Sequence, residues 1–408
     1  MGYSEKAVKG LGWAGFLQIA LKGISFIKFV IIARFLFPAE LGIFGVALIT
    51  TGFFDAMTET GISSYLIQTD DKHSKYISTA WVTSIVRGFA LSILTLIAAY
   101  PVSIFFNNKS VLGIVLVASL IPLAKGLINP SEIIFQKNLK FNKDFYYRFT
   151  LSVFDFFIAS VLVIIYRNAF ALVVALLFST LFQVFLSFIV FSPWPRFVFD
   201  LNKIKDIFNF GKWITFITAS NYFVEQFDGI IVGKLLGLGS LGIYELAQKF
   251  SLQLMIDGGN VFSKITFPLF SLIKNDNPRT ARALKRVLLL AFLIFGTLTV
   301  LLVIFSRVIL SIFAGAKWIS ADIPLKIFSV VGLITVMMAI VTSLFLAKAR
   351  QDITAKIILA RFIILGVIII PASLHFGIIG ASSASLLSYV LVLPIALIGL
   401  KQIFKFKK

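Results

Sequence analysis

Long apolar runs alternate with short polar segments along almost the whole chain. An α-helix needs about 20 mainly apolar residues to cross the hydrocarbon core of a membrane. The pattern therefore predicts an all-α integral membrane protein of about twelve transmembrane helices. The connecting segments are too short for a folded domain outside the membrane. The predicted spans are residues 11–33, 42–66, 78–100, 110–129, 149–166, 170–191, 213–235, 241–270, 287–305, 324–346, 355–374 and 377–399.

The chain resembles itself when each residue is compared with the residue 200 positions later. Trp13 matches Trp213, and the Leu-Gly-Ile sequence of residues 41–43 recurs at 241–243. Six predicted spans separate the two copies, so both copies have the same orientation, and the repeat axis runs along the membrane normal. We therefore expect two parallel six-helix lobes related by a pseudo-two-fold axis, an arrangement typical of alternating-access transporters. The predicted lobes are residues 1–200 and 201–408.

Positive charge is distributed unevenly between the two sides of the predicted membrane. Of the 38 Lys and Arg residues, 24 lie in segments on the side of the N-terminus and 6 in segments on the opposite side. Cytoplasmic loops are the ones that carry excess Lys and Arg. This predicts a multi-pass protein of a bacterial or archaeal cytoplasmic membrane with both termini in the cytoplasm. The N-terminus has no small-residue cleavage site, so we expect the first span to be retained.

Composition narrows the classes of function. The chain is 59% hydrophobic and 14% charged, whereas soluble domains are about 45–50% apolar and about 25% charged. We therefore expect a membrane protein and not a soluble enzyme. The formal charge of +20 follows from membrane topology, so nucleic acid is not an expected partner. The absence of cysteine excludes disulfides and thiolate metal sites, and with only two histidines no metal site is expected.

One sequence matches a nucleotide-binding motif by chance. Residues 237–242 fit G-x-G-x-x-G, but the dinucleotide motif requires a preceding strand and a βαβ unit. Here the motif joins two apolar spans, so we interpret it as a tight turn between helices. No G-x-x-x-x-G-K-[ST] sequence is present, so ATP is not the expected energy source and no cofactor is predicted.

Ionisable residues within or at the ends of the spans are the candidate site. Each costs about 2.5–3.5 kcal/mol or more at the bilayer centre, so such groups usually face a cavity or a partner. Cations in the first lobe suit an anionic substrate group, and acids suit proton or sodium coupling or gating. Structural ion pairs and side chains that extend to the membrane surface are the alternatives. The predicted substrate-binding residues are Lys22, Lys28, Arg34 and Arg87, and the predicted coupling or gating residues are Asp55, Glu59, Glu225, Asp228 and Asp257.

Four stretches resemble the polysaccharide (O-antigen and exopolysaccharide) flippases of the multidrug/oligosaccharidyl-lipid/polysaccharide exporter superfamily. Residues 33–42 (ARFLFPAELG) resemble the family signature at the end of the first helix. Residues 59–68 (ETGISSYLIQ), 129–141, and 228–244 with DGIIVGKLLG and LGIY resemble three further family stretches. In the lipid II branch, two arginines six residues apart on the first helix are held to bind pyrophosphate. Lys22 and Lys28 occupy the matching positions.

The resemblance implies a function in surface polysaccharide biosynthesis. We expect a flippase that moves an undecaprenyl-pyrophosphate-linked oligosaccharide from the cytoplasmic to the outer face of the membrane, driven by a proton or sodium gradient. Its expected partners are the lipid-linked oligosaccharide, membrane lipid, and polymerases and glycosyltransferases of the same pathway. A multidrug cation antiporter of the same superfamily is the main alternative. A membrane-embedded glycosyltransferase or polymerase would need a large acidic loop, and the sequence has none.

Overall fold

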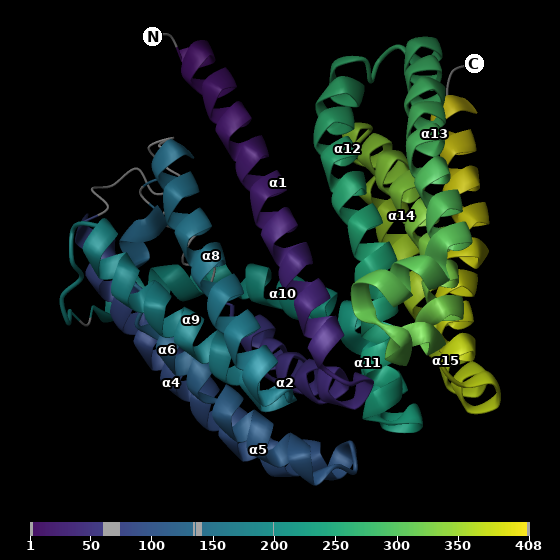
Figure 1. The fold of residues 1–408 in the computed structure, drawn as a ribbon. Helices are drawn as coiled ribbons and strands as arrows, with labels where there is room; N and C mark the ends of the chain where they lie inside the picture. The colour runs from purple at the N-terminus through teal and green to yellow at the C-terminus, as the bar shows by residue number, and fades with distance from the viewer. Residues whose placement is uncertain (1–2, 60–73, 134, 136–140, 199, 406–408) are drawn as a thin grey trace. The chain divides into compact units, whose positions relative to one another are not determined.

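Helices make up nearly all of the protein. The computed structural model describes residues 3–59, 74–133, 135, 141–198 and 200–405 (Figure 1). Every regular element within these residues is a helix. Only helices and closed barrels satisfy their backbone hydrogen bonds internally, as lipid requires. The predicted all-α membrane fold is confirmed.

The helices match the predicted spans. Eight are long and apolar enough to cross a membrane within the described part of the chain. One of them, α15 (Gln351–Lys405), supplies two predicted spans because it is kinked at Gly377 (φ 59°, ψ −139°). The remaining predicted spans correspond to α1 (Tyr3–Phe35), α10 (Leu201–Leu236) and the continuous run from α11 to α12. Charged residues in these three lower their hydropathy. Residues 60–66 of the second predicted span lie outside the described residues.

The contacts divide the chain into two compact units, Met1–Gln226 and Phe227–Lys408. The boundary between these units falls within α10, whereas the repeat predicted a boundary between residues 200 and 201. The predicted bounds of the two lobes stay a prediction. Besides α1, the first unit contains α2 (Pro38–Met57), α4 (Ser74–Phe105), α5 (Lys109–Ala118), α6 (Leu120–Gly126), η1 (Pro130–Glu132), α8 (Phe141–Tyr166) and α9 (Ala169–Val190). Before α15, the second contains α11 (Leu238–Ala247), η2 (Gln248–Leu252), α12 (Gln253–Leu272), α13 (Asn277–Ile309), η3 (Leu310–Ala314), η4 (Ala316–Ala321) and α14 (Asp322–Ala347).

Local signals set where the helices begin. Pro38 starts α2, where its missing N–H costs no helical hydrogen bond. The side chains of Asn108, Asn168 and Asp276 accept hydrogen bonds from the first backbone N–H groups of α5, α9 and α13. Gly237 (φ 84°) connects α10 to α11, so the G-x-G-x-x-G sequence is a turn between helices, as predicted.

In the first unit, α4 packs against α5 and α6, and α8 packs against α1 and α9. Helix α2 contacts α4, α5 and α9. Small residues allow a close approach of α4 and α6. A Cβ added at Gly88 would lie 2.5 Å from the Pro122 carbonyl oxygen, and one added at Gly126 would lie 2.6 Å from the Ser84 carbonyl oxygen. Only glycine permits this helix–helix distance.

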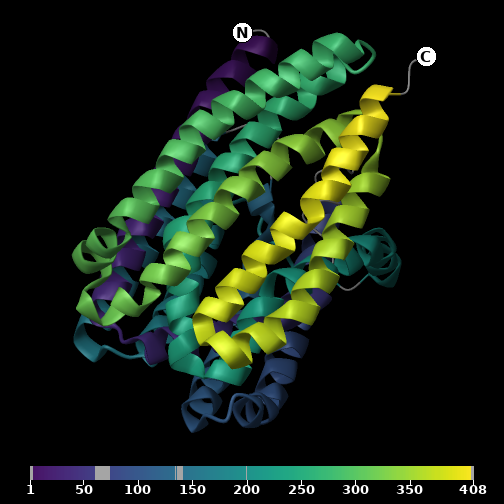
Figure 2. The ribbon, with the colours of Figure 1, turned by 90° about the vertical axis from the view of Figure 1, so that its right-hand side faces the viewer.

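In the second unit, α14 is the central helix and packs against α12, α13 and α15 (Figure 2). Leu325, Phe328 and Val331 of α14 are completely buried.

In both units, apolar side chains also lie on the surface. Phe89 and Ile97 of the first unit and Val367 of the second are more than half exposed. A soluble protein does not leave so much apolar surface in water, so lipid is the solvent for these faces.

Candidate functional site

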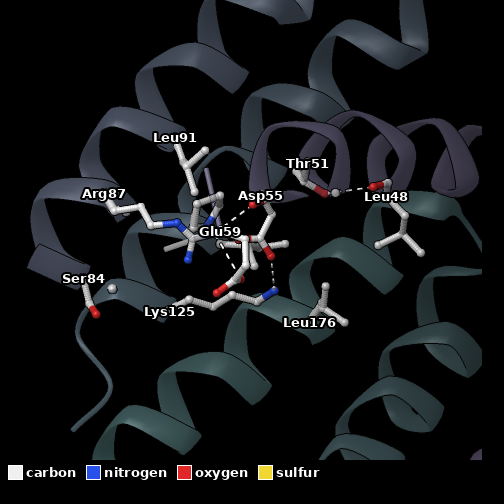
Figure 3. A pocket seen from close by; sticks show the side chains of 14 residues that line it. Leu48, Thr51, Asp55, Glu59, Ser84, Arg87, Leu91, Lys125 and Leu176 are labelled. Atoms are coloured by element: carbon white, nitrogen blue, oxygen red, sulfur yellow. Dashed lines mark hydrogen bonds and ion pairs between the residues drawn. The ribbon is translucent and has the colours of Figure 1, made fainter. Parts of the chain in front are cut away.

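A charged cavity lies inside the first unit. It has a volume of about 300 Å³ and is lined mainly by α2, α4 and α6. Asp55 extends into it from the last turn of α2, Glu59 from just beyond the end of that helix, Arg87 from α4 and Lys125 from α6 (Figure 3). Gly52, Leu91, Ile121 and Leu176 are among the uncharged residues of its wall. The cavity therefore places four ionisable groups among membrane helices.

Arg87 organises the cavity. Its Nη2 lies 2.5 Å from Asp55 Oδ1 and donates to the Asp55 carbonyl oxygen at 2.8 Å. Its Nε donates to Thr58 Oγ1 at 3.1 Å, and Nη2 lies 3.6 Å from Glu59 Oε2. Thr58 is the C-cap of α2. The guanidinium thus lies where the helix dipole of α2 is negative, which favours a cation.

Lys125 is the more accessible cation of the cavity. Its Nζ lies 3.9 Å from Asp55 Oδ2, and 54% of its side chain is exposed, against 22% for Arg87. With two cations and two carboxylates, the cavity residues have no net charge when all four groups are ionised. Arg87 and Lys125 directly precede Gly88 and Gly126, so the close approach of α4 and α6 also sets the spacing of the two cations.

The other predicted cations of the first unit lie elsewhere. Lys28 forms an ion pair with Asp155 of α8, whose other carboxylate oxygen accepts a hydrogen bond from Ser179 Oγ at 3.0 Å. Lys22 and Arg34 are exposed on α1, Arg34 in its last turn. None of these three cations is among the described residues that line the cavity. Of the four predicted substrate-binding residues, the structure therefore brings only Arg87 together with the acids Asp55 and Glu59.

The predicted acids of α10 have different surroundings. Asp228 accepts hydrogen bonds from Tyr244 Oη at 2.8 Å, Gln248 Nε2 at 3.0 Å and its neighbour Gly229 N at 2.8 Å. These are the donors that hold a carboxylate in place within a low-dielectric interior. Glu225 is exposed.

The last predicted acid, Asp257, lies on α12. It accepts a hydrogen bond from Gln253 Nε2 at 3.3 Å, one helical turn earlier. Within the described residues, no group of three or more His, Asp or Glu side chains is arranged to hold a metal ion. Asp228 and Asp257 therefore have different hydrogen-bond partners and lie in different surroundings.

Sequence reasoning did not include Lys125 or Asp155 among the site residues. Both were visible as ionisable groups within predicted spans. A further signal was the glycine that directly follows both Arg87 and Lys125, because glycine in a membrane helix often marks a close helix–helix contact.

The fold and its apolar helices define a multi-pass membrane protein with a charged cavity among its helices. Residues 31–323 match the model of the family described as polysaccharide biosynthesis protein, and the chain belongs to that family. The family resemblance stated from the sequence is confirmed.

Two relatives from bacteria cover most of the chain. The teichuronic acid biosynthesis protein TuaB of Bacillus subtilis (strain 168) is 24% identical over 353 residues, which are 86% of this chain and 73% of TuaB. The lipopolysaccharide biosynthesis protein WzxC of Escherichia coli (strain K12) is 22% identical over 96% of this chain and 80% of WzxC.

Solved transporter structures share the fold. The lipid II flippase MurJ in an inward closed conformation has a TM-score of 0.73 at 16% identity, over 97% of this chain and 89% of MurJ. A multidrug resistance transporter of the MATE family in an inward-facing conformation has a TM-score of 0.61 at 14% identity, over 96% of both chains. The twelve-helix architecture predicted from the sequence fits these neighbours.

Proposed function

We propose that this protein is a flippase that moves a lipid-linked oligosaccharide across the cytoplasmic membrane for surface polysaccharide biosynthesis. The observation that carries the proposal is the cavity in which Arg87 and Lys125 face the interior of a membrane-spanning helix bundle. Membership of the polysaccharide biosynthesis family and the names of TuaB and WzxC support the substrate class.

The physical problem that such a protein solves is the head group. A polyprenyl tail remains in the lipid, but moving sugar hydroxyls and charged phosphates through hydrocarbon without hydrogen bonds costs several kcal/mol per polar group. Arg87 offers a planar guanidinium that can bind two phosphate oxygens. Lys125 offers an accessible, mobile ammonium. The carboxylates of Asp55 and Glu59 can accept hydrogen bonds from sugar hydroxyls.

We further place both termini in the cytoplasm, because 24 Lys and Arg residues lie on that side and 6 on the other. The likeness to transporters supports transport and not enzymatic catalysis as the activity. Proton or sodium coupling through Asp55, Glu59 or Asp228 remains part of the proposal. Polymerases and glycosyltransferases of the same pathway are the proposed functional partners.

Transport is tested in proteoliposomes that contain a fluorescent polyprenyl-pyrophosphate oligosaccharide. An impermeant quencher added outside reports how fast the labelled sugar crosses the bilayer. We expect the purified protein to accelerate crossing, and Lys125→Gln to slow it about ten- to one hundred-fold, since one hydrogen bond to a charged group contributes about 1.5–3 kcal/mol. Lys109→Gln, at an exposed lysine at the start of α5, is the matched control and should transport normally.

The same vesicles separate the proposal from the multidrug antiporter alternative. An antiporter would expel a cationic dye when a proton or sodium gradient is applied, and the oligosaccharide would not cross faster than in empty vesicles. That pair of results would overturn the proposed function. Equal transport by wild type and Lys125→Gln would remove the cavity from the mechanism.

A further inference from the structure

A second cavity, an open apolar groove, lies in the second unit on α13, α14 and the C-terminal part of α15. It has a volume of about 540 Å³, and Lys285 is the only charged residue among the described residues that line it. It shares no residue with the charged cavity of the first unit. The proposed transport mechanism therefore leaves the apolar groove without a role.

The groove has a packed floor and an open rim. Leu284, Met338 and Ala396 on its floor are each less than 10% exposed, whereas Leu289 and Leu397 on its rim are each 58% exposed. The helices that form it are long and apolar enough to cross a membrane. An open apolar groove on such helices faces hydrocarbon, so a lipid chain can enter it from the side.

One end of the groove is strongly cationic. The start of α13 and the end of α15 lie at the same end of the unit (Figures 1 and 2), and Asn277 Nδ2 donates to the Ile403 carbonyl oxygen at 3.5 Å. Helix α13 and residues 390–405 contain no acidic residue. The cations on these segments near this end include Arg279, Arg282, Lys285, Arg286 and Lys401, all exposed.

Helix geometry places a cation at the mouth of the groove. Ala281, Lys285, Leu288 and Phe292 line it at the i, i+4, i+7 and i+11 spacing of one helix face. Lys285 is within the first three turns of α13, and Phe292 lies about 10 Å further along at 1.5 Å per residue. One face of α13 thus presents a positive charge for an anionic head group and, next to it, an apolar surface for a hydrocarbon chain.

We propose that the apolar groove binds an anionic phospholipid, with one acyl chain along α13 and α15 and its phosphate against Lys285. Cations near a membrane surface attract anionic lipids, and the apolar lining provides no hydrogen-bonding partner for a peptide. A second copy of this chain fits less well. A two-fold contact through the same surface would bring two sets of these five cations together, and the nearby acids are too few to neutralise them: Asp276 precedes α13, and Asp352 is already paired with Arg350.

Native mass spectrometry of the protein with equal amounts of phosphatidylglycerol and phosphatidylethanolamine tests the proposal. We expect one phosphatidylglycerol to remain bound to the wild type. Ala281→Trp should abolish this adduct by filling the groove. Lys285→Gln should lower the preference for phosphatidylglycerol about five-fold, the effect of one cation near a membrane surface.

Two variants at exposed positions outside the described lining of the groove serve as matched controls. Leu290→Trp, on α13, controls for the added indole, and Lys109→Gln, in the first unit, controls for the lost charge; both should bind phosphatidylglycerol as the wild type does. Persistence of the adduct in folded Ala281→Trp would overturn the proposal. Equal binding of the two phospholipids to the wild type would also overturn it, as would displacement of the phospholipid by polyprenyl phosphate at equal concentration. A wild-type dimer that the Ala281→Trp substitution dissociates would point to a second copy of the chain in the groove and would overturn the proposal as well.

Discussion

At the scale of single residues, Lys28 has a structural partner that changes its predicted role. Its ammonium is paired with Asp155, which Ser179 also holds through a hydrogen bond. Only about a quarter of either charged side chain is exposed. A pair with so little exposure, in a membrane helix bundle, connects α1 to α8. This contact provides a structural reason for Lys28 within the first unit, besides any contact with substrate.

We expect Lys28→Ala to lower the stability of the protein by about 1–3 kcal/mol, because the half-buried Asp155 carboxyl would lose its ion-pair partner. The melting temperature in detergent measures this loss. The exchanged pair, Lys28→Asp with Asp155→Lys, should recover most of it. Lys22→Ala, at an exposed position on the same helix, is the control. The structural role of Lys28 would be contradicted if both Lys28→Ala and the exchanged pair had the melting temperature of the wild type. If the exchanged pair then also failed to transport, Lys28 would act on the substrate.

Residue pairs show where sequence reasoning ends. The sequence placed Lys28 and Asp155 on the first and fifth predicted spans as unusual charged groups. It could not pair them, because 127 positions separate them and only tertiary packing selects the partner. For the same reason Asp55, Glu59 and Arg87 were predicted as separate candidates, and their convergence with Lys125 became visible only in the fold.

At the scale of elements, the contact between α4 and α6 supports the candidate site. Gly88→Ala should destabilise the protein, since its new Cβ would lie 2.5 Å from the backbone oxygen of Pro122, which cannot move without its helix. We expect a loss of about 1–3 kcal/mol together with slower transport, as the spacing of Arg87 and Lys125 changes. Melting temperature and the vesicle assay measure the two effects.

Gly113→Ala is the matched control, because its added Cβ would make only an ordinary contact, 3.8 Å from Phe170. Both substitutions improve helix propensity by about 1 kcal/mol, so the difference between them isolates the helix–helix contact. A Gly88→Ala variant as stable as Gly113→Ala would contradict the close approach of α4 and α6.

The helices were the most predictable elements. An apolar run long enough to cross a membrane has few alternatives to a helix, because lipid offers its backbone no hydrogen bonds. Breaks within runs were less predictable. The spans 355–374 and 377–399 were separated correctly, and Gly377 supplies the positive φ at the kink. The short π-helical segment η2, by contrast, has no signal in the sequence.

At the scale of the whole molecule, the natural absence of cysteine makes topology directly testable. A single cysteine at Lys109, the first residue of α5, should react with an impermeant thiol reagent in intact cells. One at Asn275, in the exposed turn between α12 and α13, should react only after the cells are opened. The charge distribution between the two sides is the physical reason for this expectation. Labelling of Asn275→Cys from outside would contradict the cytoplasmic placement of the termini.

The carboxylates beside Arg87 and Lys125 have a consequence for cargo release. On the proposed function, an incoming phosphate meets cations that already have internal counter-ions, so it binds only by displacing Asp55 and Glu59 from them. Part of the binding free energy is spent on that ion exchange, which keeps the affinity modest. A carrier benefits from this arrangement, because a cavity of unopposed cations would hold the pyrophosphate too tightly to deliver it. The returning carboxylates help to expel the head group on the far side of the membrane.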